Sequence, residues 1–323
     1  MAVQWPLLIF SVLLGASSGI MIFLGIGELR GSFKKVRFPL SLIALILLAV
    51  GGCASAVHLG HIDRALYILG NVNSAFSREL FAVGFTGLMT LVYVILAKKD
   101  YPGASKVFGI LAAIGGLLLP IIAGASYMMP ARPAWDSFAL PLMYLGTGVG
   151  MGFVLSAAYV YSKGDDADKA FSMTLAVVGI VASVAVTLIY VVWVAVAPYP
   201  DPTRSLMRLA AGDLAPAFWL GVVLVGMAGP VVIAVMAKRG SFVDTPGAGA
   251  DGASADPEPT VAGVDASGAA TAAPAAAATA TAAANKFSTA SALWAALACL
   301  VVGSVVLRVL MYTVGTSVEY LIY

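Results

Sequence analysis

Both histidines of the chain lie in one short polar stretch, SAVHLGHIDRAL, which covers residues 55–66. This stretch places His58 and His61 close to Asp63 and Arg64. A neutral imidazole can accept a proton near neutral pH, because the ordinary pKa of histidine is about 6.5. A neighbouring carboxylate can then orient the imidazole or pass the proton on. These residue types therefore predict a site of proton transfer.

A second group of charged residues, Arg78 and Glu79, stands at the start of a long apolar run. If the apolar runs are membrane helices, His58, Glu79 and an arginine can converge at one membrane surface. Ionisable groups at membrane depth are costly, which favours a functional role for them. Two simpler interpretations stay open. His58 can be a boundary residue that is hydrogen-bonded to water or a carbonyl, and Glu79 can be an acid that the helix dipole favours at a helix start.

The composition indicates that lipid is the solvent for most of the chain. Of its 323 residues, 61% are hydrophobic and 11% are charged, whereas an average soluble domain has about 25% charged residues. The net charge of +2 is too small to indicate a nucleic-acid partner. The apolar runs are long and continuous, so they predict helices and not barrel strands. The expected fold is an all-α, polytopic helical bundle in membrane lipid.

Eight apolar runs are long enough to span a membrane, for which a helix needs about 20 residues. The predicted spans are 6–28, 38–58, 79–97, 107–129, 138–161, 170–197, 214–237 and 289–313. Twelve basic residues lie in the loops that follow odd-numbered spans, and five lie in the remaining loops. Because basic loops stay in the cytoplasm, both termini and the SAVHLGHIDRAL stretch are predicted to lie outside.

One segment differs in composition from the rest of the chain. Residues 240–288 consist mainly of Ala, Thr, Gly and Pro with a few acids. Such a segment cannot bury enough apolar surface to offset the entropy lost on ordering. The predicted organisation is a membrane bundle of seven spans (1–239), a disordered cytoplasmic linker (240–288), and an eighth span with an outer C-terminus (289–323).

Several kinds of redox centre are not supported by the sequence. A haem held between two helices needs histidines on both, but His58 and His61 are three residues apart. An iron–sulfur cluster needs about four cysteines, and the sequence has only Cys53 and Cys299. No metal-ligand pair has a useful spacing, and no glycine loop could cradle a phosphate. A redox function would therefore require a mobile carrier and a partner that accepts its electrons.

Four segments resemble, in order along the sequence, the membrane anchor subunit of dimethyl sulfoxide reductase-type enzymes. They are WPLLIFSV (5–12), ASAVHLGHIDRALYILGNVNSAFSREL (54–80), AWDSFALP (134–141) and RVLMY (308–312). The HLG…R…N…S…E order is the most specific feature, and segment 240–288 has no counterpart. The resemblance implies a haem-free, multi-pass protein of the bacterial plasma membrane that oxidises menaquinol near the outer face. The electrons taken from menaquinol would pass to a four-cluster iron–sulfur subunit and then to a molybdopterin catalytic subunit.

The same resemblance suggests functional residues. His58 stands where the family has its quinol-site histidine, and Glu79 matches the associated acid, although the spacing is one residue shorter. Arg64 and Arg308 match arginines of the family pattern, with roles in quinol binding or subunit contact. The resemblance thus predicts His58 and Glu79 as catalytic and adds Arg64 and Arg308 to the quinol-binding set. Menaquinol would be an exchangeable substrate, and neither a metal nor an iron–sulfur cluster would belong to this chain.

Two other functions remain open. A quinone-active anchor of the polysulfide or nitrite reductase type would share the architecture without the HLG pattern. A proton-coupled secondary transporter could use His58, Asp63 and Glu79 as a relay. Transporters bind their substrates near the bilayer midplane between broken helices, whereas these residues are expected near the membrane surface, which disfavours a transporter.

Overall fold

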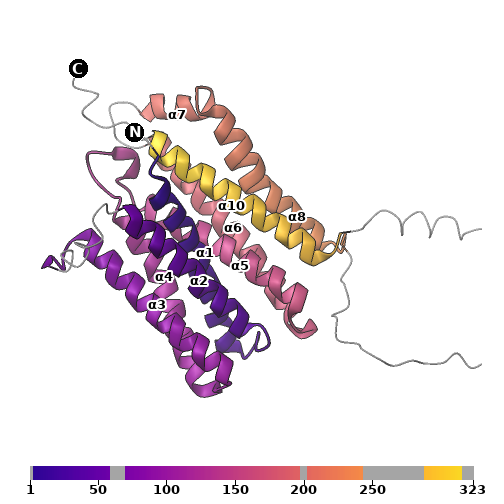
Figure 1. Ribbon diagram of the computed structural model, residues 1–323. Coiled ribbons are helices and arrows are strands. Elements are labelled where there is room, and N and C mark those ends of the chain that lie inside the picture. The colour runs from indigo at the N-terminus through magenta and orange to yellow at the C-terminus, as the bar shows by residue number, and fades with distance from the viewer. Residues whose placement is uncertain (1–2, 59–69, 197–201, 243–286, 315–323) are drawn as a thin grey trace, which may run out of the picture.

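The computed structural model describes residues 3–58, 70–196, 202–242 and 287–314. The described residues form a bundle of long helices (Figure 1), and eight of its segments are long and apolar enough to cross a membrane. This confirms the predicted all-α class and the number of spans. The predicted linker at 240–288 lies almost entirely outside the described residues.

The elements in sequence order are α1 (Trp5–Arg30), α2 (Arg37–His58), α3 (Ala75–Lys99), α4 (Pro102–Ala125), η2 (Pro133–Trp135), α5 (Ala139–Lys163), α6 (Asp166–Val196), α7 (Pro202–Ala210), η3 (Ala217–Ala228), α8 (Gly229–Lys238) and α10 (Thr289–Val314).

The observed ends of α3 and α4 differ from the predicted spans, and the differences have local causes. The α3 helix begins at Ala75 because Ser74 caps it, accepting a hydrogen bond from the Ser77 amide. The α4 helix ends at Ala125, four residues before the predicted end. Beyond it, the Tyr127 and Met128 amides donate to carbonyls three residues back, at 3.2 and 3.1 Å. This tightened turn carries polar and aromatic side chains out of the helix.

Direct backbone contact between two central helices organises the bundle. The α1 and α5 helices are its most buried spans, and each carries two glycines four residues apart. A Cβ atom on Gly148 would lie 2.7 Å from the Gly15 carbonyl oxygen, and one on Gly19 would lie 2.9 Å from the Gly152 Cα. Only glycine allows helices to approach so closely, as in small-residue packing motifs of membrane proteins. The crossing of α1 and α5 therefore depends on these four residues.

The remaining spans pack on either side of this pair. The α2, α3 and α4 helices form one side, and α6, α10 and the span built from η3 and α8 form the other (Figure 1). The α10 and η3 helices also meet through glycines, since a Cβ atom on Gly226 would lie 2.6 Å from the Gly303 Cα. The π-helix η3 runs directly into α8, and together they form the seventh span.

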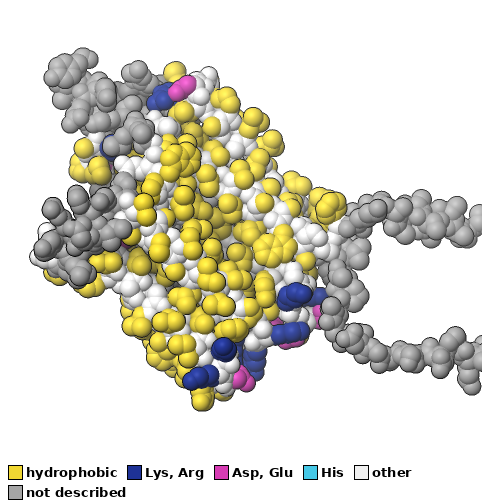
Figure 2. All heavy atoms as spheres, viewed as in Figure 1, with side chains coloured by type: hydrophobic (Ala, Val, Ile, Leu, Met, Phe, Trp, Pro, Cys, Tyr) yellow, Lys and Arg dark blue, Asp and Glu magenta, His cyan; other side chains and the backbone are white. Residues whose placement is uncertain are grey.

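Charged residues separate the two ends of the bundle. Figure 2 shows a wide apolar band, with most of the visible Lys and Arg side chains beyond one edge of it. We call this end the lysine face; it comprises the α1–α2, α3–α4 and α5–α6 connections and the end of α8. Ion pairs join its elements, including Arg37 with Glu28 and Asp100, and Lys35 with Asp165. The opposite end carries α7, η2 and the start of α1, and we call it the cavity face.

Candidate functional site

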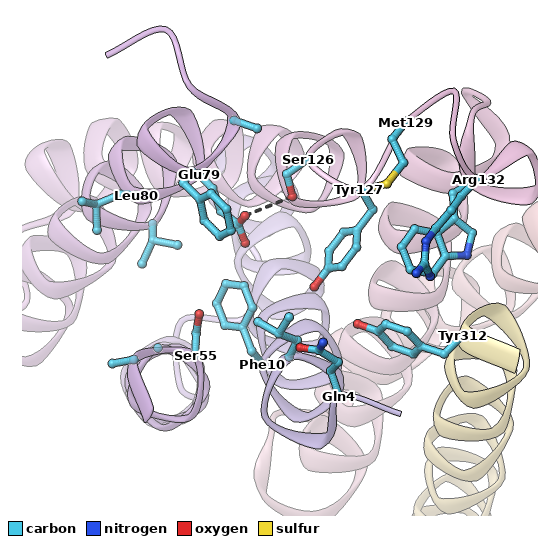
Figure 3. Close-up of a pocket in the computed structure, with 17 residues that line it drawn as sticks. Gln4, Phe10, Ser55, Glu79, Leu80, Ser126, Tyr127, Met129, Arg132 and Tyr312 are labelled. Carbon is cyan, nitrogen blue, oxygen red and sulfur yellow. Dashed lines mark hydrogen bonds between the residues drawn. The ribbon is translucent and has the colours of Figure 1, made fainter. Parts of the chain in front are cut away.

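A cavity of about 470 Å³ opens at the cavity face, between α1, α2, α3, α10 and the α4–α5 connection (Figure 3). Its volume falls within the range of about 300–1,000 Å³ that is typical of small-molecule sites. Most of its wall is apolar, with contributions from Phe10, Phe76, Leu80 and Val83. The polar and charged side chains that line it are Gln4, Ser55, Glu79, Ser126, Tyr127, Arg132, Trp135 and Tyr312. The cavity thus combines a large apolar volume with a few hydrogen-bonding groups.

Glu79 is the one carboxylate among the described residues that line the cavity. It lies in the second turn of α3, whose first residue is fixed by the Ser74 cap. The side chain points toward the turn that follows α4 (Figure 3), where its Oε2 lies 3.1 Å from the Ser126 hydroxyl. A half-buried carboxylate beside an apolar volume can exchange a proton with a bound molecule.

The Ser126 hydroxyl has two possible acceptors. Its oxygen lies 3.1 Å from Glu79 Oε2 and 2.7 Å from the carbonyl oxygen of Ala123. A hydroxyl carries a single hydrogen, so it donates to one of these oxygens at a time. When Glu79 is ionised, Ser126 can donate to it; when Glu79 is protonated, Ser126 can accept from it and donate to Ala123. The pair can therefore follow a change in the protonation of Glu79.

Aromatic side chains build the wall opposite α3. The Trp135 ring packs edge-to-face against Tyr127 and Tyr312, with centroids 5.9 and 5.5 Å apart. The Arg132 guanidinium lies 4.4 Å from the centre of the Trp135 ring, a favourable cation–π arrangement. Trp135 also donates from Nε1 to the Met311 carbonyl at 2.9 Å. The wall thus joins the α4–α5 connection to the end of α10.

Arg308 lies behind this wall and does not line the cavity. It is fully buried in α10, and it donates to the hydroxyls of Ser11 and Ser304 at 2.8 and 2.5 Å. Its guanidinium lies 4.7 Å from the centre of the Tyr144 ring, whose centroid is 5.9 Å from that of Tyr127. A buried cation held by neutral groups creates a positive potential in its surroundings. Arg308 can therefore act on the cavity electrostatically, although it does not line it.

The sequence-predicted site residues fall into three groups. Glu79 lines the cavity, and Arg308 lies behind its aromatic wall. His58 is the last residue of α2, three positions after Ser55, which lines the cavity; its side chain is outside the described structure. Arg64 also lies outside the described residues. The fold thus brings Glu79 and the end of α2 to the same cavity, while the roles of His58 and Arg64 stay predictions.

Of the eight polar and charged residues that line the cavity, the sequence predicted only Glu79 as a site residue. The other seven are Gln4, Ser55, Ser126, Tyr127, Arg132, Trp135 and Tyr312. Ser126 and Tyr127 lie within the predicted span 107–129, so they were counted as part of a membrane helix. Tyr312 belongs to the RVLMY segment, in which only Arg308 was predicted as a site residue. The prolines after Met129, at positions 130 and 133, were the available signal that the backbone leaves the helix early.

Comparison with known proteins agrees with this architecture. The model of the DMSO reductase anchor subunit family matches residues 1–198, which is most of the chain and includes six spans. Arg308 and Tyr312 lie beyond the matched region. The match, together with the eight spans, identifies a multi-pass protein of the bacterial inner membrane.

Three curated relatives match about half of this protein. It is 30% identical to the YnfH protein of the anaerobic dimethyl sulfoxide reductase of Escherichia coli over 165 residues. It is 29% identical to the C subunit of anaerobic dimethyl sulfoxide reductase from the same organism, over 169 residues, and 26% identical to the C subunit from Haemophilus influenzae, over 161 residues. These alignments span 47–48% of this protein and 57–58% of the relatives. The family match over residues 1–198 shows that this chain belongs to the DMSO reductase anchor subunit family.

Proposed function

We propose that this protein is the membrane anchor of a dimethyl sulfoxide reductase-type complex and that it oxidises menaquinol in the cavity. In this proposal an iron–sulfur subunit with four clusters docks on the cavity face and receives the electrons. A molybdopterin subunit then reduces the terminal acceptor. The observation that carries the proposal is the position of Glu79, a carboxylate at the polar end of a largely apolar cavity.

The cavity suits the chemistry of a quinol head group. A naphthoquinol is a flat apolar ring system with a hydroxyl at each of two opposite positions. Aromatic side chains such as Tyr127 and Tyr312 can pack against the ring, and polar atoms can bind its hydroxyls. A carboxylate accepts a hydrogen bond from a quinol hydroxyl, and it can then take the proton. Glu79 is therefore assigned as one of the proton acceptors.

The oxidation releases two protons and two electrons from each quinol. One O–H proton goes to the Glu79 carboxylate, and Ser126 then turns its own hydrogen toward the Ala123 carbonyl. The second proton goes to His58, in accordance with the family resemblance. Both electrons leave through the partner subunit, because the reaction uses no electron-storing group of this protein. Quinone remains, and the protons are released on the outer side.

The test compares two electron donors in the purified complex. The Glu79→Gln variant keeps the shape of the side chain but is unable to accept a proton, so menaquinol oxidation should fall by about 100-fold or more. His58→Ala should have a comparable effect. Reduction of the terminal acceptor by a soluble dye, which bypasses the membrane subunit, should stay at the wild-type rate. Full menaquinol turnover in Glu79→Gln would contradict the assignment.

Asp213 supplies a matched control, because it is a carboxylate on the same face that does not line the cavity. It pairs with Arg208 at 2.7 Å instead. Asp213→Asn should leave menaquinol oxidation unchanged. Quenching of the fluorescence of a quinol analogue by the complex would show whether Glu79→Gln affects binding or only turnover.

A further inference from the structure

We infer that the cavity opens sideways into the membrane between α2 and α3, and that the polyisoprenoid tail of the quinol occupies this opening. The inference rests on the proposed function, since it locates the apolar part of the proposed substrate. Figure 3 shows the two sides of the opening, marked by Ser55 on α2 and Leu80 on α3. We call this opening the lateral portal and define it by Gly52, Ala56, Phe76 and Leu80, all of which line the cavity.

The two helices are in contact below the portal. A Cβ atom on Gly87 of α3 would lie 3.7 Å from the Leu48 side chain of α2, an ordinary van der Waals distance. Leu48 itself is buried. Gly52 lies four residues further along α2, about 6 Å toward the cavity face. A Cβ atom placed there would meet nothing within 4 Å. The helices thus separate between Leu48 and Gly52.

Adjacent glycines on α2 have different environments. A Cβ atom on Gly51 would lie 3.3 Å from the Leu13 side chain of α1, so this glycine serves helix packing. Gly52 faces open space and lines the cavity. Ser55 and Ala56 continue the same wall with small side chains. The α2 side of the portal therefore leaves room beside it for another molecule.

The α3 side of the portal belongs both to the cavity and to the outer surface of the bundle. Phe76 and Leu80 line the cavity, yet they are 62% and 43% exposed. Cys53, next to Gly52 on α2, is exposed as well. The cavity wall therefore continues onto the exterior of the bundle at this point.

The depth of the portal indicates what lies outside it. Gly52 precedes the end of α2 at His58 by six residues, a distance of about 9 Å along the helix. Around that depth the exposed side chains of α2 and α3 include Val50, Val57 and Phe81, which are apolar and can contact acyl chains in a membrane. A long apolar chain can pass from the cavity into this region without contacting water. A polyisoprenoid tail has this chemistry, and a charged ligand does not.

The experiment measures how filling the portal changes the oxidation of quinol donors with and without a tail. Gly52→Leu and Ala56→Leu fill the portal, whereas Gly84→Leu adds the same side chain to an exposed glycine of α3 that does not line the cavity. The kcat/KM of the whole complex is measured with a long-tailed menaquinol and with a tail-less naphthoquinol. Co-purification of the subunits shows whether each variant complex assembles. If Gly52→Leu does not assemble, the comparison uses Ala56→Leu alone.

We expect the ratio of kcat/KM for the long-tailed donor to that for the tail-less donor to fall about tenfold in both portal variants. The ratio should stay at the wild-type value in Gly84→Leu. An unchanged ratio in an assembled portal variant would overturn the portal while leaving quinol oxidation intact. If the wild-type complex oxidises neither donor, the proposed function itself is wrong, and the inferred role of the portal is wrong as well.

Discussion

The indole Nε1 of Trp135 donates a 2.9 Å hydrogen bond to the carbonyl oxygen of Met311, joining residues 176 positions apart. Met311 lies in the last turn of α10, where carbonyl groups have no donor within the helix. Arg208 binds the same end of α10 in a similar way, since its guanidinium donates a hydrogen bond to the Thr313 carbonyl at 3.1 Å. Side chains from two other segments thus cap α10, and one of them also forms part of the cavity wall.

Replacing Trp135 with phenylalanine should loosen this wall. The variant keeps an aromatic ring but leaves the buried Met311 carbonyl without its donor, which costs about 1–3 kcal/mol. The thermal unfolding midpoint in detergent should fall, and the KM for menaquinol should rise. Trp219→Phe is the control, because Trp219 makes an equivalent 2.8 Å bond to the Ala210 carbonyl but is half exposed. Equal destabilisation by the two changes would show that burial of the bond is unimportant.

Ser126→Ala tests the partner of the Glu79 carboxylate. The change removes the hydroxyl that lies 3.1 Å from Glu79 and adds no bulk. Menaquinol oxidation should slow about tenfold, which corresponds to about 1.4 kcal/mol of transition-state stabilisation. The loss should be smaller than that in Glu79→Gln, because the proton acceptor remains. Ser162→Ala removes a comparable hydroxyl on α5, bonded at 2.7 Å to the Ala158 carbonyl, and should leave turnover unchanged.

Arg308→Lys tests whether the buried cation needs its planar shape. A lysine retains the charge but cannot hold Ser11 and Ser304 in the same forked geometry. The free energy of unfolding should fall by about 1–3 kcal/mol because buried polar groups lose partners. Denaturation of the detergent-solubilised protein measures the effect, and Arg78→Lys at an exposed position is the control. Wild-type stability in Arg308→Lys would mean that charge alone suffices.

Gly152→Ala tests the central crossing of α1 and α5. The added methyl group would overlap the backbone of Gly19, so the two helices must separate. Overpacking of this kind costs about 1–3 kcal/mol. The yield of folded protein and its unfolding midpoint should fall. Gly84→Ala adds the same methyl group where nothing lies within 4 Å, and it should not destabilise the protein. A neutral Gly152→Ala would argue against close contact of the two backbones.

The membrane orientation can be tested by labelling single cysteines in intact cells. In a background with both native cysteines replaced by serine, Asn71→Cys should react with a maleimide that cannot cross the membrane. Asn71 is exposed and precedes α3 on the cavity face. Lys34→Cys, exposed on the lysine face, should react only after the cells are opened. The reverse pattern would place the cavity in the cytoplasm and rule out release of protons on the outer side.

Sequence alone predicted the membrane spans well because the signal is local. Each run of about 20 apolar residues stabilises a membrane helix independently of the others, so eight runs give eight spans. Glu79 could also be singled out in this way, because an ionisable group at membrane depth is costly. The residue types also indicated His58 as a proton acceptor, and the family resemblance assigned it to the quinol site. The structure describes the end of α2 at His58 but not its side chain.

The cavity could not be predicted in the same way, because its walls come from distant parts of the sequence. Gln4, Ser126 and Tyr312 reach one cavity only after glycine contacts bring the central helices together. The early end of α4 depends on a turn that hydropathy cannot distinguish from helix, since Met128 and Met129 continue the apolar run.

The amino-acid sequence thus determined the number of the spans, which follows from the transfer of local apolar segments into lipid, and the unequal distribution of basic residues between their loops. Tertiary structure decided which side chains share the cavity. It placed Arg308 behind the aromatic wall and not among the residues that line the cavity. The physical reason is that helix packing depends on the shapes of two surfaces at once. A pattern along one segment records only one of them.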